Sequence, residues 1–89
     1  MKAVITVTGK DTTGIIAKVS TKCSEYEANI VDISQSVLQE YFAMIMLVEI
    51  DKLTIKFADF VDALKKLGEQ NGLSIQAMHE DIFNSMHRI

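Results

Sequence analysis

The first ten positions of the chain alternate between apolar and more polar residues. Ala3, Ile5 and Val7 occupy every second position and alternate with Lys2, Val4, Thr6 and Thr8. A strand with one buried face has this period of two, because its successive side chains point to opposite faces of a sheet. The pattern therefore predicts a strand that ends near Gly9.

The period changes after residue 13, where apolar residues recur at intervals of three and four. Such spacing places side chains along one side of a helix. The predicted buried stripe of this helix consists of Ile16, Val19, Cys23 and Tyr26. Because Asn tolerates the left-handed conformation that ends many helices, we expect the helix to end at Asn29. Its cap is expected from one of three short polar residues: Asp11, Thr12 or Thr13.

Two strands joined by a tight turn are predicted to follow. In the first, Val31, Ile33 and Val37 alternate with an aspartate and two serines, so only one of its faces is apolar. The turn is expected at residues 39 and 40. The second strand, residues 41–50, is apolar on both faces, which is typical of a central strand that is covered on both sides.

The rest of the chain predicts a second helix, a fourth strand and a short tail helix. The apolar positions of the second helix are Phe57, Phe60, Val61, Leu64 and Leu67. Thr54 is expected to cap this helix, and Asn71-Gly72 to end it. The fourth strand contains Leu73, Ile75 and Ala77. The tail from Glu80 is predicted to place four apolar residues on one side of a helix: Ile82, Phe83, Met86 and Ile89.

This order of elements, strand-helix-strand-strand-helix-strand plus a terminal helix, predicts the fold. Right-handed crossovers place both main helices on one face of a four-stranded antiparallel sheet. We therefore expect an α+β, ferredoxin-like fold for a single domain spanning residues 1–89, since no linker or repeat divides the chain. The other face would carry Val4, Ile45 and Leu47. It needs a cover, either the tail helix or a second copy of the chain.

Composition narrows the classes of function. The net charge is −3 at pH 7, whereas a nucleic-acid backbone binds basic surfaces, so no nucleic-acid partner is expected. The longest apolar run, residues 41–48, is too short to span a bilayer. We therefore expect no membrane partner and a cytoplasmic protein. Hydrophobic residues make up 48% of the chain, a large share for so small a domain, and this favours a homodimer.

The loop after the first strand is the strongest candidate for a binding site. Its sequence runs Gly9-Lys10-Asp11-Thr12-Thr13-Gly14-Ile15. A helix N-terminus presents unpaired N–H groups and partial positive charge, which suits a carboxylate. Asn29 or Asp32 would then bind the ammonium group or the side chain of the same ligand. The alternative is a purely structural connection, in which Gly14 lets the helix approach the sheet and Asp11 caps it.

The remaining polar residues form no catalytic set along the sequence. There is no nucleophile with a base and an acid, and no carboxylate pair at a motif spacing, so we expect no enzyme activity, no cofactor and no metal. His79, Glu80 and Asp81 are consecutive, which points their side chains in different directions, and helix capping by Asp81 is a simpler role than metal binding. Cys23 lies on the apolar stripe and is expected to be a buried structural thiol.

Other uses of a ferredoxin-like fold leave marks that this sequence lacks. RNA-reading versions stack bases on aromatic residues, but the first strand has none. Residues 7–17, VTGKDTTGIIA, followed by residues 29–33, NIVDI, resemble the ACT domain, a small regulatory module that commonly binds amino acids. More narrowly, residues 33–37 and 82–86 are similar to the small stand-alone ACT proteins of the UPF0237 group.

The resemblance implies a binding module that is usually dimeric, with its ligand between the first loop and the start of the second strand. Transferred to matching positions of this sequence, it implies these ligand-binding residues: Gly9, Asp11, Thr12, Thr13, Gly14, Ile15, Asn29, Ile30 and Asp32. The leading hypothesis is thus a homodimeric, non-catalytic regulator that binds a small molecule, an amino acid. The alternative is an adaptor without a small-molecule ligand, whose open sheet face or edge strand binds another protein.

Overall fold

The computed structural model describes residues 1–10 and 14–86 of the chain. In chain order its elements are β1 (Lys2–Lys10), α1 (Ile15–Glu25), β2 (Asn29–Leu38), β3 (Tyr41–Glu49), α2 (Phe57–Asn71), β4 (Ser74–His79) and α3 (Glu80–Met86). All strand pairs are antiparallel, and the strand order is β2-β3-β1-β4. This arrangement confirms the predicted α+β, ferredoxin-like fold.

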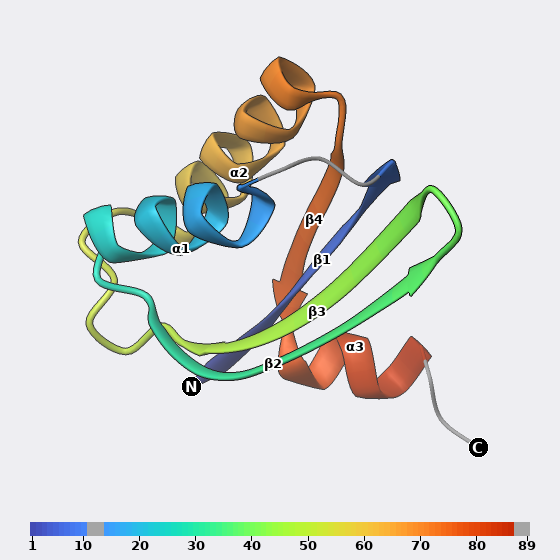
Figure 1. Ribbon diagram of the computed structural model, residues 1–89. Helices are drawn as coiled ribbons and strands as arrows, with labels where there is room; N and C mark the ends of the chain where they lie inside the picture. Colours follow the sequence, from blue (N-terminus) through green and yellow to red (C-terminus); the bar gives the residue numbers. More distant parts are fainter. Residues whose placement is uncertain (11–13, 87–89) are drawn as a thin grey trace.

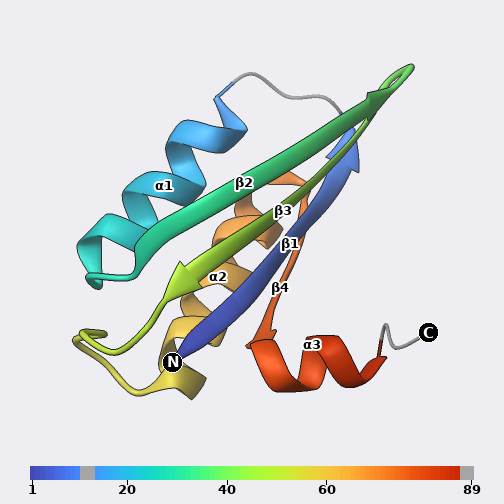
Figure 2. The same ribbon diagram turned by 90° about the horizontal axis from the view of Figure 1, so that it is seen from below.

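The elements form layers on the two sides of the sheet. Helices α1 and α2 lie on one face, and the short helix α3 lies on the other (Figure 1). Seen from below, α3 extends from the end of β4 and lies away from β2 and β3 (Figure 2). Helix α2 packs along β4, whereas α1 lies nearest β2. We refer to the two sides as the helix face and the open face.

The hydrophobic core fills the space between the helix face and the two long helices. Strand β1 contributes Ala3, Ile5 and Val7, as its alternation predicts, and β3 contributes its alternate residues from Phe42 to Val48. Phe60 of α2 is fully buried, and the ring of Tyr26 meets it edge-on at a centroid distance of 6.3 Å. Burying a side chain of that size stabilises a fold by about 1.5 to 3 kcal/mol relative to leaving it exposed.

The buried stripe of α1 starts one residue earlier than predicted. Ile15, Val19 and Cys23 are buried, whereas Ile16 is exposed. The helix begins at Ile15, and residues spaced by four from this start face the sheet. The prediction for Ile16 is therefore wrong, because the phase of the stripe depends on where the first turn begins.

Helix α1 also ends differently from the prediction. The left-handed residue is Glu27, with φ 59°, and Asn29 begins β2 instead. The N–H of Glu27 donates to the carbonyl oxygen of Ser24 at 3.2 Å, and the N–H of Ala28 donates to that of Cys23 at 2.9 Å. These two bonds are the Schellman pattern, which satisfies the last carbonyls of a helix.

One end of α2 agrees with the prediction and the other does not. Gly72, with φ 68°, ends the helix as predicted. Thr54 does not cap it, because the helix begins at Phe57, after an extended Lys56 without a side-chain cap. The N–H of Thr54 donates instead to the carbonyl oxygen of Tyr26 at 3.0 Å, which ties the segment before α2 to the end of α1.

Strand β2 forms one edge of the sheet and carries a β-bulge. Ile30 pairs with Val48 and Asp32 with Leu47, so Val31 is an extra residue between them. The predicted alternation of Val31 with Ile33 is therefore interrupted. The turn between β2 and β3 is at residues 39 and 40, as predicted, with Gln39 at φ 56°.

Strand β3 is central, as predicted, but only its helix face is fully covered. Ile45 lies on the open face opposite Thr6 and Ser34 and is 47% exposed. Helix α3 contacts β1 and β4, and Val4 on the open face is buried. The tail helix is thus one part of the expected cover.

Helix α3 is present as predicted but departs from one detail. Ile82 and Met86 are exposed, and Phe83 is half-buried. Asp81 lies inside the first turn of a helix that begins at Glu80, so it does not occupy the cap position. Ile89 lies outside the described residues.

Candidate functional site

The sequence-predicted site residues fall into two groups at opposite ends of the sheet. Gly9 pairs with Phe42 of β3, which pairs with Val37 near the end of β2, whereas Asn29 pairs with Glu49, which pairs with Lys2 at the start of β1. Strands β1 and β2 therefore run parallel. The seven residue steps from Lys2 to Gly9 correspond to about 23 Å along the strand. One chain alone does not bring the two groups together.

The first group surrounds the N-terminus of α1. Of its members, Asp11, Thr12 and Thr13 lie outside the described residues, as does the cap expected from them. The first bond of the helix ladder joins the N–H of Lys18 to the carbonyl oxygen of Gly14 at 3.0 Å. The N–H groups of residues 15–17 precede it and have no acceptor among the described residues. Such amides can bind an anion.

Glycine is required at Gly9 and at Gly14 for different structural reasons. A Cβ atom at Gly9 would lie 2.7 Å from a methyl carbon of Leu73, so Gly9 permits a close approach of β1 to the start of β4. A Cβ atom at Gly14 would meet nothing within 4 Å, but Gly14 has φ 83°, a left-handed conformation that favours glycine. The structural alternative, in which Gly14 lets the helix approach the sheet, is therefore wrong in its reason. The side chain of Ile15 is buried in the core.

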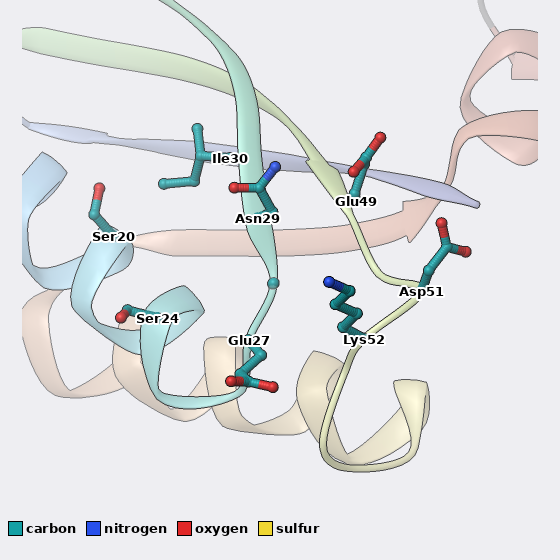
Figure 3. A pocket seen from close by; sticks show the side chains of 9 residues that line it. Ser20, Ser24, Glu27, Asn29, Ile30, Glu49, Asp51 and Lys52 are labelled. Atoms are coloured by element: carbon teal, nitrogen blue, oxygen red, sulfur yellow. The ribbon is translucent and has the colours of Figure 1, made fainter.

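The second group lies at a hollow of about 660 Å³ at the start of β2. Asn29 and Ile30 line it, between α1 on one side and the end of β3 on the other (Figure 3). The remaining lining residues were not singled out from the sequence: Ser20, Ser24, Glu27, Ala28, Glu49, Asp51 and Lys52. The four-residue spacing of Ser20 and Ser24 is the signal that could have revealed this wall, since it marks a polar line beside the buried stripe of α1.

Carboxylates outnumber cations around this hollow. The hollow is lined by three carboxylates and one lysine: Glu27, Glu49, Asp51 and Lys52. Asp51 accepts a hydrogen bond from the N-terminal ammonium of Met1 at 2.6 Å, but both groups are exposed. The excess of negative charge suits the positively charged end of a ligand, with the weak interaction energies that are usual for exposed groups.

Asp32 does not belong to this hollow. Its cross-strand neighbour is Leu47, which places it on the open face, and its carboxylate oxygen accepts a hydrogen bond from the N–H of Ile33 at 2.9 Å. Ile30 instead pairs with Val48 and lies on the helix face. Asn29 and Ile30 are therefore together in the structure, and Asp32 is separate from them.

Cys23 and His79 belong to neither group of candidate site residues. Burial raises the pKa of the Cys23 thiol from 9.0 to about 11, so the thiol is neutral at physiological pH. The ring of His79 stacks on that of Phe57 at a centroid distance of 4.2 Å. In residues 1–10 and 14–86 no three acidic, histidine or cysteine side chains are placed to hold a metal ion.

Comparison with known protein families decides the identity of this fold. A family model described as the ACT domain matches residues 2–78. The chain belongs to the ACT domain family. Within it, a UPF0237 protein of Methanocaldococcus jannaschii is 47% identical over 88 residues, which cover 99% of this chain and 98% of the relative. The predicted UPF0237 membership is thereby confirmed.

Solved structures agree with this assignment. An ACT domain protein from Streptococcus pneumoniae has a TM-score of 0.82 and 42% identity, with 93% of each chain covered. The regulatory subunit of aspartate kinase from Thermus thermophilus, in its ligand-free form, has the same fold at a TM-score of 0.65. Its identity is 23%, and the match covers 86% of this chain and half of that subunit.

Membership of the ACT domain family indicates a general role for this chain, that of a regulatory ligand-binding module. None of the helices within the described residues is long and apolar enough to cross a membrane.

Proposed function

We propose that this chain is a non-catalytic, cytoplasmic sensor that acts as a homodimer and binds a free amino acid between its two subunits. All of residues 1–89 would form one sensing domain. The ligand carboxylate would bind the amides at the start of α1 in one subunit, and the ligand ammonium would bind near Asn29 and Glu49 of the other subunit. The single observation that carries the proposal is the separation of the two residue groups within one chain.

The exposed edge of β2 supports a dimer. Among the described strands, this ten-residue strand pairs only with β3, and an unpaired edge is a template for another strand. Several of its apolar side chains are exposed: Val31, Ile33, Val37 and Leu38. Pairing with a second copy would shield both the backbone edge and these side chains, which is the usual outcome for an apolar patch on a small domain.

Two-fold symmetry of such a pair would complete the site. In an antiparallel pairing with the axis near the middle of β2, the start of each β2 lies beside the end of its copy. Within each subunit, the end of β2 lies at the same end of the sheet as Gly9, because Val37, Phe42 and Gly9 are successive neighbours. The helix start of one subunit would therefore approach the hollow of the other subunit.

Ligand binding would regulate through a shift of population. A ligand that contacts both subunits stabilises the paired state by its binding free energy in that state. A single subunit would provide only part of the contacts to the ligand. We therefore expect ligand affinity and dimer affinity to rise together. The likeness in fold to an aspartate kinase regulatory subunit fits a regulatory role of this kind.

A direct test is isothermal titration calorimetry with each free amino acid, on the native chain and on Gly14→Leu. The substitution adds a side chain at the helix start and should abolish binding. Gly72→Leu is the matched control for backbone strain, because Gly72 also has positive φ and open space around it. Equal binding by all three proteins would remove the helix start from the site.

A mixing experiment separates a shared site from a site within one chain. Gly14→Leu and Asn29→Ala would each damage one half of every shared site, so neither variant alone should bind. After subunit exchange, a mixed dimer concentrates both changes in one site and leaves the other intact. Equal amounts should therefore restore about a quarter of the sites. No restoration, despite proven exchange, would contradict a shared site.

A further inference from the structure

We infer that the outer edge of β4, together with the groove beside α2, is a docking site for an extended segment of another protein. This edge is the one opposite β2, so the inference does not depend on the proposed dimer or its ligand. The segment would add as a fifth strand to the sheet of this chain and run antiparallel to β4.

The groove is a hollow of about 500 Å³ that follows β4 along its helix-face side. Its helix wall consists of Val61, Lys65 and Glu69, which are spaced by four residues and therefore form one line along α2. Its strand wall includes Ile75 and Ala77, which pair with buried β1 residues on the helix face. Helix α2 and strand β4 lie side by side and run in opposite directions (Figures 1 and 2).

The backbone of β4 defines what can fill this groove. Strand β4 is the last strand of the sheet and pairs only with β1 among the described elements. In an antiparallel strand, the N–H and C=O groups of alternate residues point away from the paired neighbour. On β4 these groups form a row along the outer edge. An added strand satisfies such a row, and its alternate side chains then point into the adjoining groove.

A second copy of this chain is a poor occupant because of Lys65. Gly68 contacts the start of β4, since a Cβ atom there would lie 2.7 Å from the carbonyl oxygen of Leu73 and 3.1 Å from a side-chain carbon of Ile75. Lys65, almost one turn earlier, therefore lies beside the middle of β4. Two-fold pairing of β4 with itself has its axis at that level and would bring two Lys65 side chains together, which is unfavourable.

The charges of the groove specify the segment that fits. Lys65 and Glu69 are both exposed, and neither has an ion-pair partner among the described residues. Four residues of helix advance by about 6 Å, which matches about two residues of a strand. Reading from Val61 to Glu69, the fitting segment has an apolar, an acidic and a basic residue at every second position.

The test uses two soluble peptides of identical composition, Thr-Val-Thr-Glu-Thr-Lys-Thr and Thr-Val-Thr-Lys-Thr-Glu-Thr, with blocked ends. Each is titrated into the isotope-labelled full chain and followed by amide chemical shifts. We expect the first peptide to bind at least about threefold more tightly than the second. The largest shifts should fall on residues 74–78. Equal affinity for both peptides, no binding of either, or shifts confined to β2 would overturn the inference.

Charge-swapped variants give the second measurement. Lys65→Glu should weaken the first peptide at least about threefold, and Lys65→Glu combined with Glu69→Lys should reverse the preference between the peptides. The matched control is Lys66→Glu, which makes the same change on an exposed α2 residue outside the groove. All three residue changes are at exposed positions, so the fold is retained. An equal effect of the Lys66 and Lys65 changes would mean that only net charge matters and would overturn the inference.

Discussion

The chain buries the side chains of its two edge strands to different extents. Ile33 of β2 and Ile75 of β4 both lie on the helix face of an edge strand, but Ile33 is 37% exposed and Ile75 only 5%. Helix α2 packs directly on β4, with Gly68 against Leu73. Helix α1 instead leaves the outer part of β2 uncovered. The β2 edge therefore needs a partner to bury its side chains, whereas the β4 edge needs one only for its backbone.

This difference separates two kinds of association. An edge that exposes apolar side chains gains free energy from any partner that covers them, and a second copy of the chain is the partner always present. An edge that offers backbone groups and a charged groove selects its partner by pattern. The first kind of edge fits the proposed homodimer, and the second fits the proposed docking of another protein.

The strongest test of this comparison is a matched pair of substitutions, Ile75→Ala and Ile33→Ala. The first removes buried methyl groups and should lower the free energy of unfolding by about 2 to 5 kcal/mol. The second should cost the monomer less than about 1.5 kcal/mol, because its side chain is partly in solvent already. Urea denaturation at low protein concentration measures both. Similar losses would mean that the two edges are equally buried and would remove the distinction.

Titration of Cys23 tests how firmly α1 covers the core on the β2 side. The folded pKa, about 11, is higher than the ordinary value of 9.0, because burial disfavours the thiolate. The neutral thiol therefore contributes stability fully below pH 9, and this contribution is lost as the pH rises towards 11. The loss should be about 2 to 3 kcal/mol.

The control for this prediction is Cys23→Ala, which cannot titrate at that position. The native chain should lose more stability between pH 8 and pH 11 than the variant does, in denaturation measured at both pH values. Parallel losses in the two proteins would show that the Cys23 thiol does not account for the change. In that case α1 would open readily on the β2 side.

Gly68→Ala tests the close packing that sets β4 apart. Alanine favours helix formation over glycine by about 1 kcal/mol, so an unconstrained position would be stabilised. At Gly68 the new methyl group would lie 2.7 Å from a backbone oxygen, and we expect a net loss of about 1 to 3 kcal/mol. Gln70→Ala, at an exposed position of the same helix, should change stability by less than about 0.5 kcal/mol. Stabilisation by Gly68→Ala would show that α2 can move away from β4.

Much of this architecture is predictable from the sequence, for identifiable reasons. The alternation of Ala3, Ile5 and Val7 predicts β1, because a period of two over that length indicates a half-buried strand. Residues 7–17 and 29–33 give the family, which the comparisons confirm. In the predicted stripe of α1 only the first member, Ile16, is wrong, since periodicity fixes the spacing of buried residues but not the residue at which the first turn begins.

The residues of the candidate site stay a prediction from the sequence, and their arrangement in space comes only from the structure. Gly9 and Asn29 are predicted to contact one ligand, but within a single chain the parallel strands β1 and β2 hold them at opposite ends of the sheet. The predicted topology already contained this separation, because two strands that flank an antiparallel neighbour run in the same direction. Glu49 and Lys52 lie beside Asn29 only because β2 pairs with β3. No local sequence pattern predicts that they line the same hollow.

The smallest expected effect concerns how the chain enters each edge strand. Strand β4 follows Gly72 at φ 68°, which glycine adopts readily, whereas β2 follows Glu27 at φ 59°, which does not suit a residue with a Cβ atom. We therefore expect Glu27→Gly to raise the free energy of unfolding by about 0.5 to 1 kcal/mol and Gly72→Ala to lower it by a similar amount. Thermal and urea denaturation of the two variants measure the difference. If Glu27→Gly instead destabilises the chain, the side chain of Glu27 makes a contribution in the hollow beside Asn29 that outweighs its backbone strain. That outcome would mark the start of β2, unlike the start of β4, as a position retained for binding at a cost in stability.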